Sequence, residues 1–282
     1  MSICAAFGRH GGIIMLGKLI KYEFRCCARI FAILLPVFIL YTAIYRGVME
    51  FTISGTGGQT GSAISAMLFV GMTMIFILLV MGLAVFCFIY TVYRFYKNMV
   101  TDEGYLMHTL PVAPWELVTS KLIVAALEYI ATILTIVLSV FIISVGMISE
   151  SDIETIKQFI DMIVGSVYGN ASQALGMILS VVSFAVSIIS GILIPYVSIA
   201  IGQLKNNNRA LWSIGVYLLI NISLSMIGSI ISVVLTSVMS ETADAALIMN
   251  LSTGISALIN VAVAVAAFVC TCKIFRENLN LR

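Results

Sequence analysis

The chain has 282 residues, of which 61% are hydrophobic and only 10% are charged, and its mean hydropathy is +1.12. Soluble domains carry about 25% charged residues, so too few charges are present here to cover a water-facing surface, and a soluble globular protein is excluded. The formal net charge of +2 says little by itself. From the hydrophobic composition, we expect membrane lipids around this chain and no nucleic acid as a partner.

Several apolar runs reach about 20 residues or more, the length that crosses a bilayer as a helix. Hydrocarbon offers no hydrogen bonds, so the backbone of each run must bond internally, and the runs do not alternate as barrel strands do. We therefore predict an all-α, polytopic membrane protein. Its six transmembrane helices are expected at about 30–45, 63–93, 122–148, 174–202, 211–238 and 247–272.

The beginning of the chain does not match this pattern. Residues 1–14 lack a sustained apolar segment, and we predict that they are a non-structural extension, with Met15 as the true start and 15–282 as a single domain. Residues 16–29 place apolar side chains on one helical face and lysines and arginines on another. This pattern predicts an N-terminal amphipathic helix in the membrane interface, or else an ordinary positive flank to the first span.

Lysine and arginine also predict the orientation of the chain. With the N-terminus inside, 13 of them fall in cytoplasmic segments, and only Arg46 and Lys157 fall outside. This is the positive-inside bias. We predict a multi-pass protein of the cell membrane with both termini in the cytoplasm.

The longest stretch that cannot lie in a bilayer is the cytoplasmic loop at 94–121. Thr101 or Asp102 can cap a short helix through about Leu110, which Pro111 ends. Pro114 is suited to begin the next helix, with Glu116 in its first turn. The result is a short helix held between two long spans, where a soluble partner can push on both.

A second amphipathic helix is predicted outside the membrane, at 152–168. Ser151 and Glu154 form a capping-box pattern, and isoleucines and valines follow at helical spacing. This helix either shields its apolar face as a linker or covers the mouth of the bundle.

Three polar residues within the spans are candidates for function. Glu128 is the only acidic residue in a predicted span, so it is a functional candidate, unless it reaches the cytoplasmic interface or hydrogen-bonds a neighbouring helix. Asn221 and Asn260 lie deeper, where they either bond neighbouring helices or line a substrate path.

Small residues recur every three or four positions on the fourth and fifth predicted spans. Such stripes allow helices to approach closely, so they predict packing faces or faces that slide during transport. They are Ser183, Ser187, Gly191, Ser225, Gly228, Ser229 and Ser232.

No constellation typical of an enzyme is present in the sequence. The stretch from Gly12 to Lys18 matches most of a phosphate-binding loop, but Leu19 replaces the required serine or threonine. The two histidines, His10 and His108, belong to no metal or catalytic motif. We expect no cofactor and no ATP hydrolysis by this chain.

The loop at 94–121 resembles that of permease subunits of ATP-binding-cassette type 2 transporters, as found in Gram-positive bacteria. The opening from Met15 to Phe24 is similar to the opening of that family. The loop residues that match are Arg94, Phe95, Tyr96, Asn98, Asp102, Glu103, Gly104, Tyr105, Leu106, Thr109, Leu110, Pro111, Val112, Ser120 and Lys121.

The resemblance implies a permease of an exporter that works with a separate ATPase subunit and a second permease, identical or different. It implies no particular substrate. It also implies a coupling helix at about 102–110, to which we assign Asp102, Glu103, Gly104, Tyr105, Leu106, Met107, Thr109, Leu110 and the following Pro111.

Two other functions remain open from the residues alone. One is a secondary carrier that uses Glu128 to bind its coupling ion and needs no ATPase. The other is a membrane sensor or scaffold that does not transport.

Overall fold

The computed structural model describes residues 4–55, 63–101, 113–144, 171–205, 208–239 and 245–277, and the isolated residues 154, 157, 158 and 165. Within them the chain forms helices α1 (Cys4–Gly55), α2 (Ala63–Val100), α4 (Pro114–Ser144), α6 (Ala171–Gly202), α7 (Arg209–Met239) and α8 (Ala245–Glu277). The predicted coupling helix at 102–110 lies outside the described residues, as does most of the predicted outer helix at 152–168.

Each of the six helices is long and apolar enough to cross a bilayer. The prediction of an all-α, multi-pass membrane protein with six spans is therefore confirmed for the part of the chain that the structure describes. Many apolar side chains along these helices are exposed on the chain itself, as is expected where hydrocarbon is the solvent.

The first helix differs from its prediction. In place of an interfacial helix over 16–29 and a separate span, α1 is one helix of 52 residues, about 78 Å long. No glycine or proline lies between Lys18 and Leu35 to end it, and Pro36 is contained within it. The helix begins at Cys4, so residues 4–14, which we expected to be non-structural, continue the same helix.

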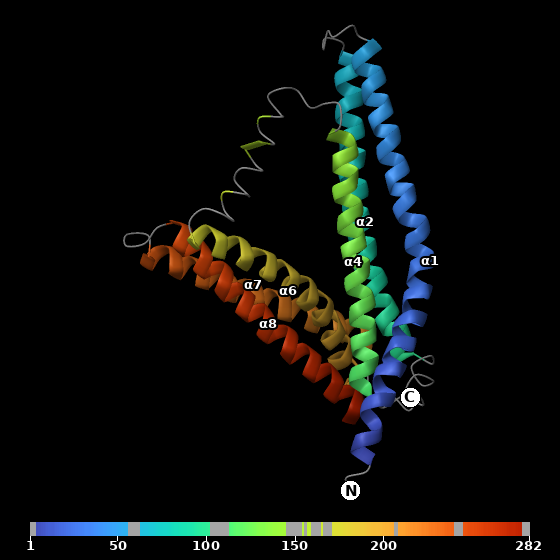
Figure 1. Cartoon of the computed structure of the whole chain (residues 1–282), viewed down its shortest axis with the longest axis vertical. Helices are drawn as coiled ribbons and strands as arrows, with labels where there is room; N and C mark the ends of the chain where they lie inside the picture. The colour runs from blue at the N-terminus through green and yellow to red at the C-terminus, as the bar shows by residue number, and fades with distance from the viewer. Residues whose placement is uncertain are drawn as a thin grey trace.

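The helices form two groups, which we call the first arm (α1, α2, α4) and the second arm (α6, α7, α8). Within the arms, α1 packs on α4, and α6 packs on α7 and α8. Figure 1 shows that the arms meet at the end where α1 begins and α8 ends, and that they diverge towards the other end. We call the meeting point the converging end; the charge bias predicts that it faces the cytoplasm.

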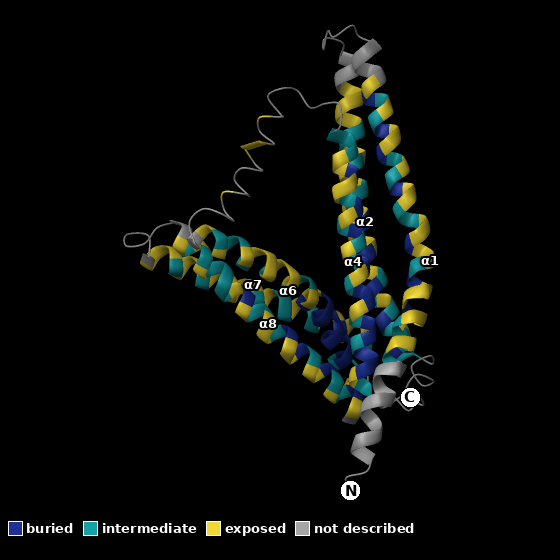
Figure 2. Cartoon of the chain, in the orientation of Figure 1, coloured by how far each residue is buried: buried dark blue, intermediate teal, exposed yellow. Residues whose placement is uncertain are grey.

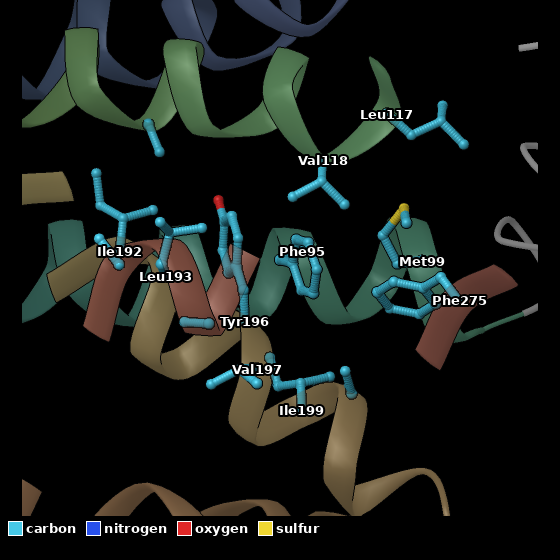
Figure 3. Packing of buried hydrophobic residues seen from close by; sticks show 14 residues of the cluster. Phe95, Met99, Leu117, Val118, Ile192, Leu193, Tyr196, Val197, Ile199 and Phe275 are labelled. Carbon is cyan, nitrogen blue, oxygen red and sulfur yellow. The ribbon is translucent and has the colours of Figure 1, made fainter. Parts of the chain in front are cut away.

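The main core of the described residues lies at the converging end and joins the two arms. Buried side chains of α2 and α4 meet those of α6 and α8 there, and Figure 2 shows the buried residues concentrated in this region. At its centre the rings of Phe95 and Tyr196 stack at 3.7 Å between centroids, as Figure 3 shows, with Phe275 edge-on to Phe95. Aromatic pairs add to the free energy that area burial supplies, so this contact holds the arms together.

Helix α4 begins as its sequence predicts. Pro114 is its first residue, and the side chain of Glu116 accepts a hydrogen bond from the backbone N–H of Ala113 at 3.3 Å. This is the reciprocal half of a capping box, and it satisfies a backbone donor that the helix leaves unpaired. The start of α4, within the stretch 94–121, is thus fixed by local chemistry.

The small-residue stripe of α7 does not pack against the part of the chain that the structure describes. Ser225, Gly228, Ser229 and Ser232 are all exposed, and the most apolar stretch of α7 contains no buried residue. The predicted packing face therefore has no counterpart among the described helices.

Helices α6 and α7 approach closely where one ends and the other begins. A Cβ atom on Gly202 would lie 2.0 Å from Ser213 Oγ and 3.0 Å from the carbonyl oxygen of Arg209. Gly215 on α7 has no atom within 4 Å of the corresponding position.

We predict that Gly202→Ala lowers the free energy of unfolding by about 1–3 kcal/mol, because the two helices must move apart. Gly215→Ala is the matched control, and we expect it to be neutral or to stabilise by up to about 1 kcal/mol. Thermal unfolding of both variants in one detergent measures the difference. Equal melting temperatures would contradict this packing.

Candidate functional site

A buried cluster of charged side chains lies at the converging end of the first arm, and Glu23 of α1 is at its centre. The Glu23 carboxylate accepts hydrogen bonds from Arg94 of α2 and Lys121 of α4. Asn98, one turn beyond Arg94, donates a longer bond of 3.4 Å to the same carboxylate. One carboxylate thus binds both helices that enter and leave the 94–121 loop.

Arg94 connects this carboxylate to a second one. Its Nη2 also donates to the backbone carbonyl of Glu23 at 2.6 Å, and its Nη1 lies 3.7 Å from Oε1 of Glu128. Glu23, Lys121 and Glu128 are each at most 7% exposed. The charges of the two acidic and two basic side chains therefore cancel. Charged side chains can be buried away from water only when they are paired in this way.

The two carboxylates are satisfied to different extents. The Glu23 carboxylate has three donors, whereas no hydrogen-bond donor among the described residues reaches the side-chain carboxylate of Glu128. Arg94 Nη1 and Glu128 Oε1 are both buried without a hydrogen-bond partner. Both residues line a cavity of about 10 Å³, close to the smallest volume that holds one water. Within the described residues, the Glu23 carboxylate therefore has hydrogen-bond donors and the Glu128 carboxylate has none.

The cluster is built directly against the core that joins the arms. Phe95 follows Arg94 on α2, and both Phe95 and its stacking partner Tyr196 line the small cavity with the charged residues. A displacement of Arg94 would therefore disturb the contact between α2 and α6.

The structure brings one of the predicted candidates to this site and leaves the two asparagines elsewhere. Glu128 belongs to the cluster. Asn221 donates to the carbonyl of Tyr217 in its own helix at 2.9 Å, in place of a neighbouring helix, and Asn260 is half-buried on α8. The assigned coupling residues from Asp102 to Pro111 lie outside the described residues.

Sequence reasoning missed Glu23, the residue on which the cluster depends. Its signal was present: Glu23 is the one acid in a stretch that also carries Lys18, Lys21, Arg25 and Arg29. In the sequence, Lys121 and Arg94 are recognisable as cytoplasmic cations and as members of the loop motif, but not as partners of Glu23. Their partnership across 98 and 71 positions of the chain has no local signature.

The cluster unites the two segments that carry the family resemblance. Glu23 lies in the opening from Met15 to Phe24, and Arg94, Asn98 and Lys121 lie in the loop motif at 94–121. Two stretches that are distant in the sequence therefore meet at one carboxylate.

Comparison with known proteins gives no independent assignment: no family model, no curated protein and no solved structure matches the chain. Within the described residues, no group of three histidine, cysteine, aspartate or glutamate side chains is arranged to hold a metal ion.

We predict that Glu23→Gln lowers the free energy of unfolding by about 3–5 kcal/mol, because Arg94 and Lys121 lose their shared buried acid. Glu50→Gln is the control, since the Glu50 side chain is 71% exposed beside Arg46, and it should change stability by less than about 1 kcal/mol. Unfolding of both variants in the same detergent provides the comparison. A Glu23→Gln protein as stable as the control would show that the cluster is not holding the helices.

Proposed function

We propose that this six-span membrane protein is the permease subunit of an ATP-driven exporter, coupled to a separate ATPase through residues 102–110. The observation that carries the proposal is the bonding of α2 and α4 to one carboxylate of α1. These are the two helices between which the predicted coupling helix is held. Any force applied to that segment acts on three helices at once.

The shape of the molecule supports a mechanical role. The first arm is tied internally by Glu23, and it meets the second arm through the aromatic core at the converging end. The arms diverge at the other end (Figure 1). A push at the converging end can therefore change the angle between the arms, which is the motion that alternating access requires. Export is the direction that the family resemblance implies.

In an ATP-driven exporter of this kind, the energy would come from another chain. The segment Gly12–Lys18 lies within α1 and lacks the serine or threonine of a phosphate-binding loop, so we assign ATP hydrolysis to a separate subunit. A second permease is supported by α7, whose most apolar stretch has no buried residue and whose small-residue stripe is exposed. Such stripes are typical of faces where membrane helices pack.

One observation favours a second candidate, an ion-coupled carrier. Glu128 is a buried carboxylate at bilayer depth, and no donor among the described residues bonds to it. An intramembrane acid of this kind can bind a coupling ion. Transport by the purified chain under an ion gradient alone, abolished by Glu128→Gln, would favour the carrier over the ATP-driven exporter.

We predict that Tyr105→Ala, Leu106→Ala and Gly104→Pro each weaken binding of the ATPase and its stimulation by about tenfold or more, because they alter the apolar surface or backbone of the coupling helix. Co-purification with a candidate ATP-binding-cassette ATPase from the source organism, followed by ATPase assays, measures both effects.

The control for these variants is Met249→Ala. Met249 is 72% exposed on α8, near the end that is predicted to face outside, so its truncation should leave binding and stimulation unchanged. If the three loop variants retain both properties, the coupling assignment is wrong. If the ATPase binds but no substrate moves under any condition, the chain is a sensor or scaffold.

A further inference from the structure

A lateral groove runs between α1 and α4 beside the charged cluster. Its volume is about 320 Å³, within the lower range of known small-molecule sites. Side chains of α1 from Phe24 to Pro36 and of α4 from Leu127 to Ala131 line it. Both segments belong to membrane-spanning stretches, so whatever enters the groove from the side comes from the lipid phase.

Glu128 is the one charged residue among the described residues that line this groove. It also lines the small cavity that holds the ion pairs. Glu128 therefore separates an apolar groove from a polar cluster, and it is the carboxylate to which no described donor bonds. Its nearest cation, Arg94, lies at 3.7 Å and is held by Glu23.

A buried carboxylate oxygen without a hydrogen-bond donor raises the free energy of the protein. A ligand that supplies the missing donor removes this penalty, so its binding is favoured by the same free energy. The donor has to arrive through an apolar groove, so it must be attached to an apolar body. A cation satisfies a carboxylate better than a neutral donor does, because its hydrogen bond is charge-assisted. An anion would be repelled by Glu128.

We propose that the α1–α4 groove binds a lipophilic primary amine, with the alkyl chain along Phe31 and Leu35 and the ammonium group on Glu128. This binding is independent of any ATPase, and it holds whether the chain exports the amine or responds to it. A neutral lipid chain that merely fills the groove is the alternative outcome of the test.

The experiment uses the full chain in nanodiscs of phosphatidylcholine and a decylammonium probe that carries a photoactivatable diazirine in its alkyl chain. We expect saturable labelling of peptides within 24–36 and 127–131, mapped by mass spectrometry. Unlabelled decylammonium should compete about tenfold better than decanol, and decanoate should compete least.

Two variants separate the ammonium site from the groove. Glu128→Gln should abolish the preference for decylammonium over decanol. Ala32→Trp places an indole in the groove without touching the cluster and should abolish labelling, whereas Ala43→Trp, at an exposed position of α1 outside the groove, should not. Thermal unfolding establishes that each variant is folded.

Four results would overturn the proposal. The first is labelling that does not saturate, and the second is equal competition by decylammonium, decanol and decanoate, which would mean that lipid chains simply fill the groove. The third is an unchanged preference for the amine in Glu128→Gln. Labelling that survives in folded Ala32→Trp would place the probe elsewhere and would count equally against it.

Discussion

Glu23 has to be paired, because it is buried inside the protein, where an isolated carboxylate is unstable. Its partners come from α2 and α4, so this requirement fixes how three helices sit at the converging end. It also ties α1 to the two helices, α2 and α4, that flank the predicted coupling helix. The stacked rings of Phe95 and Tyr196 then connect these three helices to the second arm. The charged cluster and the aromatic core are thus neighbouring parts of one joint.

The coarse fold follows from the sequence because the bilayer allows so few solutions. Long apolar runs have to be helices, and each of the six predicted spans corresponds to one helix of the structure. The predicted ends lie within about ten residues of the helix ends, except in α1, which is much longer than its predicted span. The start of α4 at Pro114 was also predictable, since a proline and a following acid form a local signal. The extent of α1 was not predictable. The same pattern of residues fits a basic amphipathic helix that is separate from the following span and one that is continuous with it.

The candidate site was only partly predictable for a related reason. Glu128 was visible as a lone acid in an apolar run, which is a property of one segment. Glu23, Arg94 and Lys121 read as members of positive flanks, and their pairing depends on how α1 packs against α2 and α4. Asn221 shows the opposite case. A polar residue deep within a predicted span suggests a hydrogen bond between helices, yet the side-chain amide of Asn221 donates to the carbonyl of Tyr217, one turn earlier in the same helix.

If the proposed exporter function holds, the first arm moves as one body against the second arm when the partner ATPase binds ATP. Spin labels at Leu138 of α4 and Ile178 of α6, both exposed, report the distance between the arms, and a label pair at Ile44 of α1 and Leu138 reports the first arm itself. In the complex with the ATPase, the account predicts that trapping ATP changes the α4–α6 distance and leaves the α1–α4 distance constant. A constant α4–α6 distance, or a change confined to α1 and α4, would contradict it.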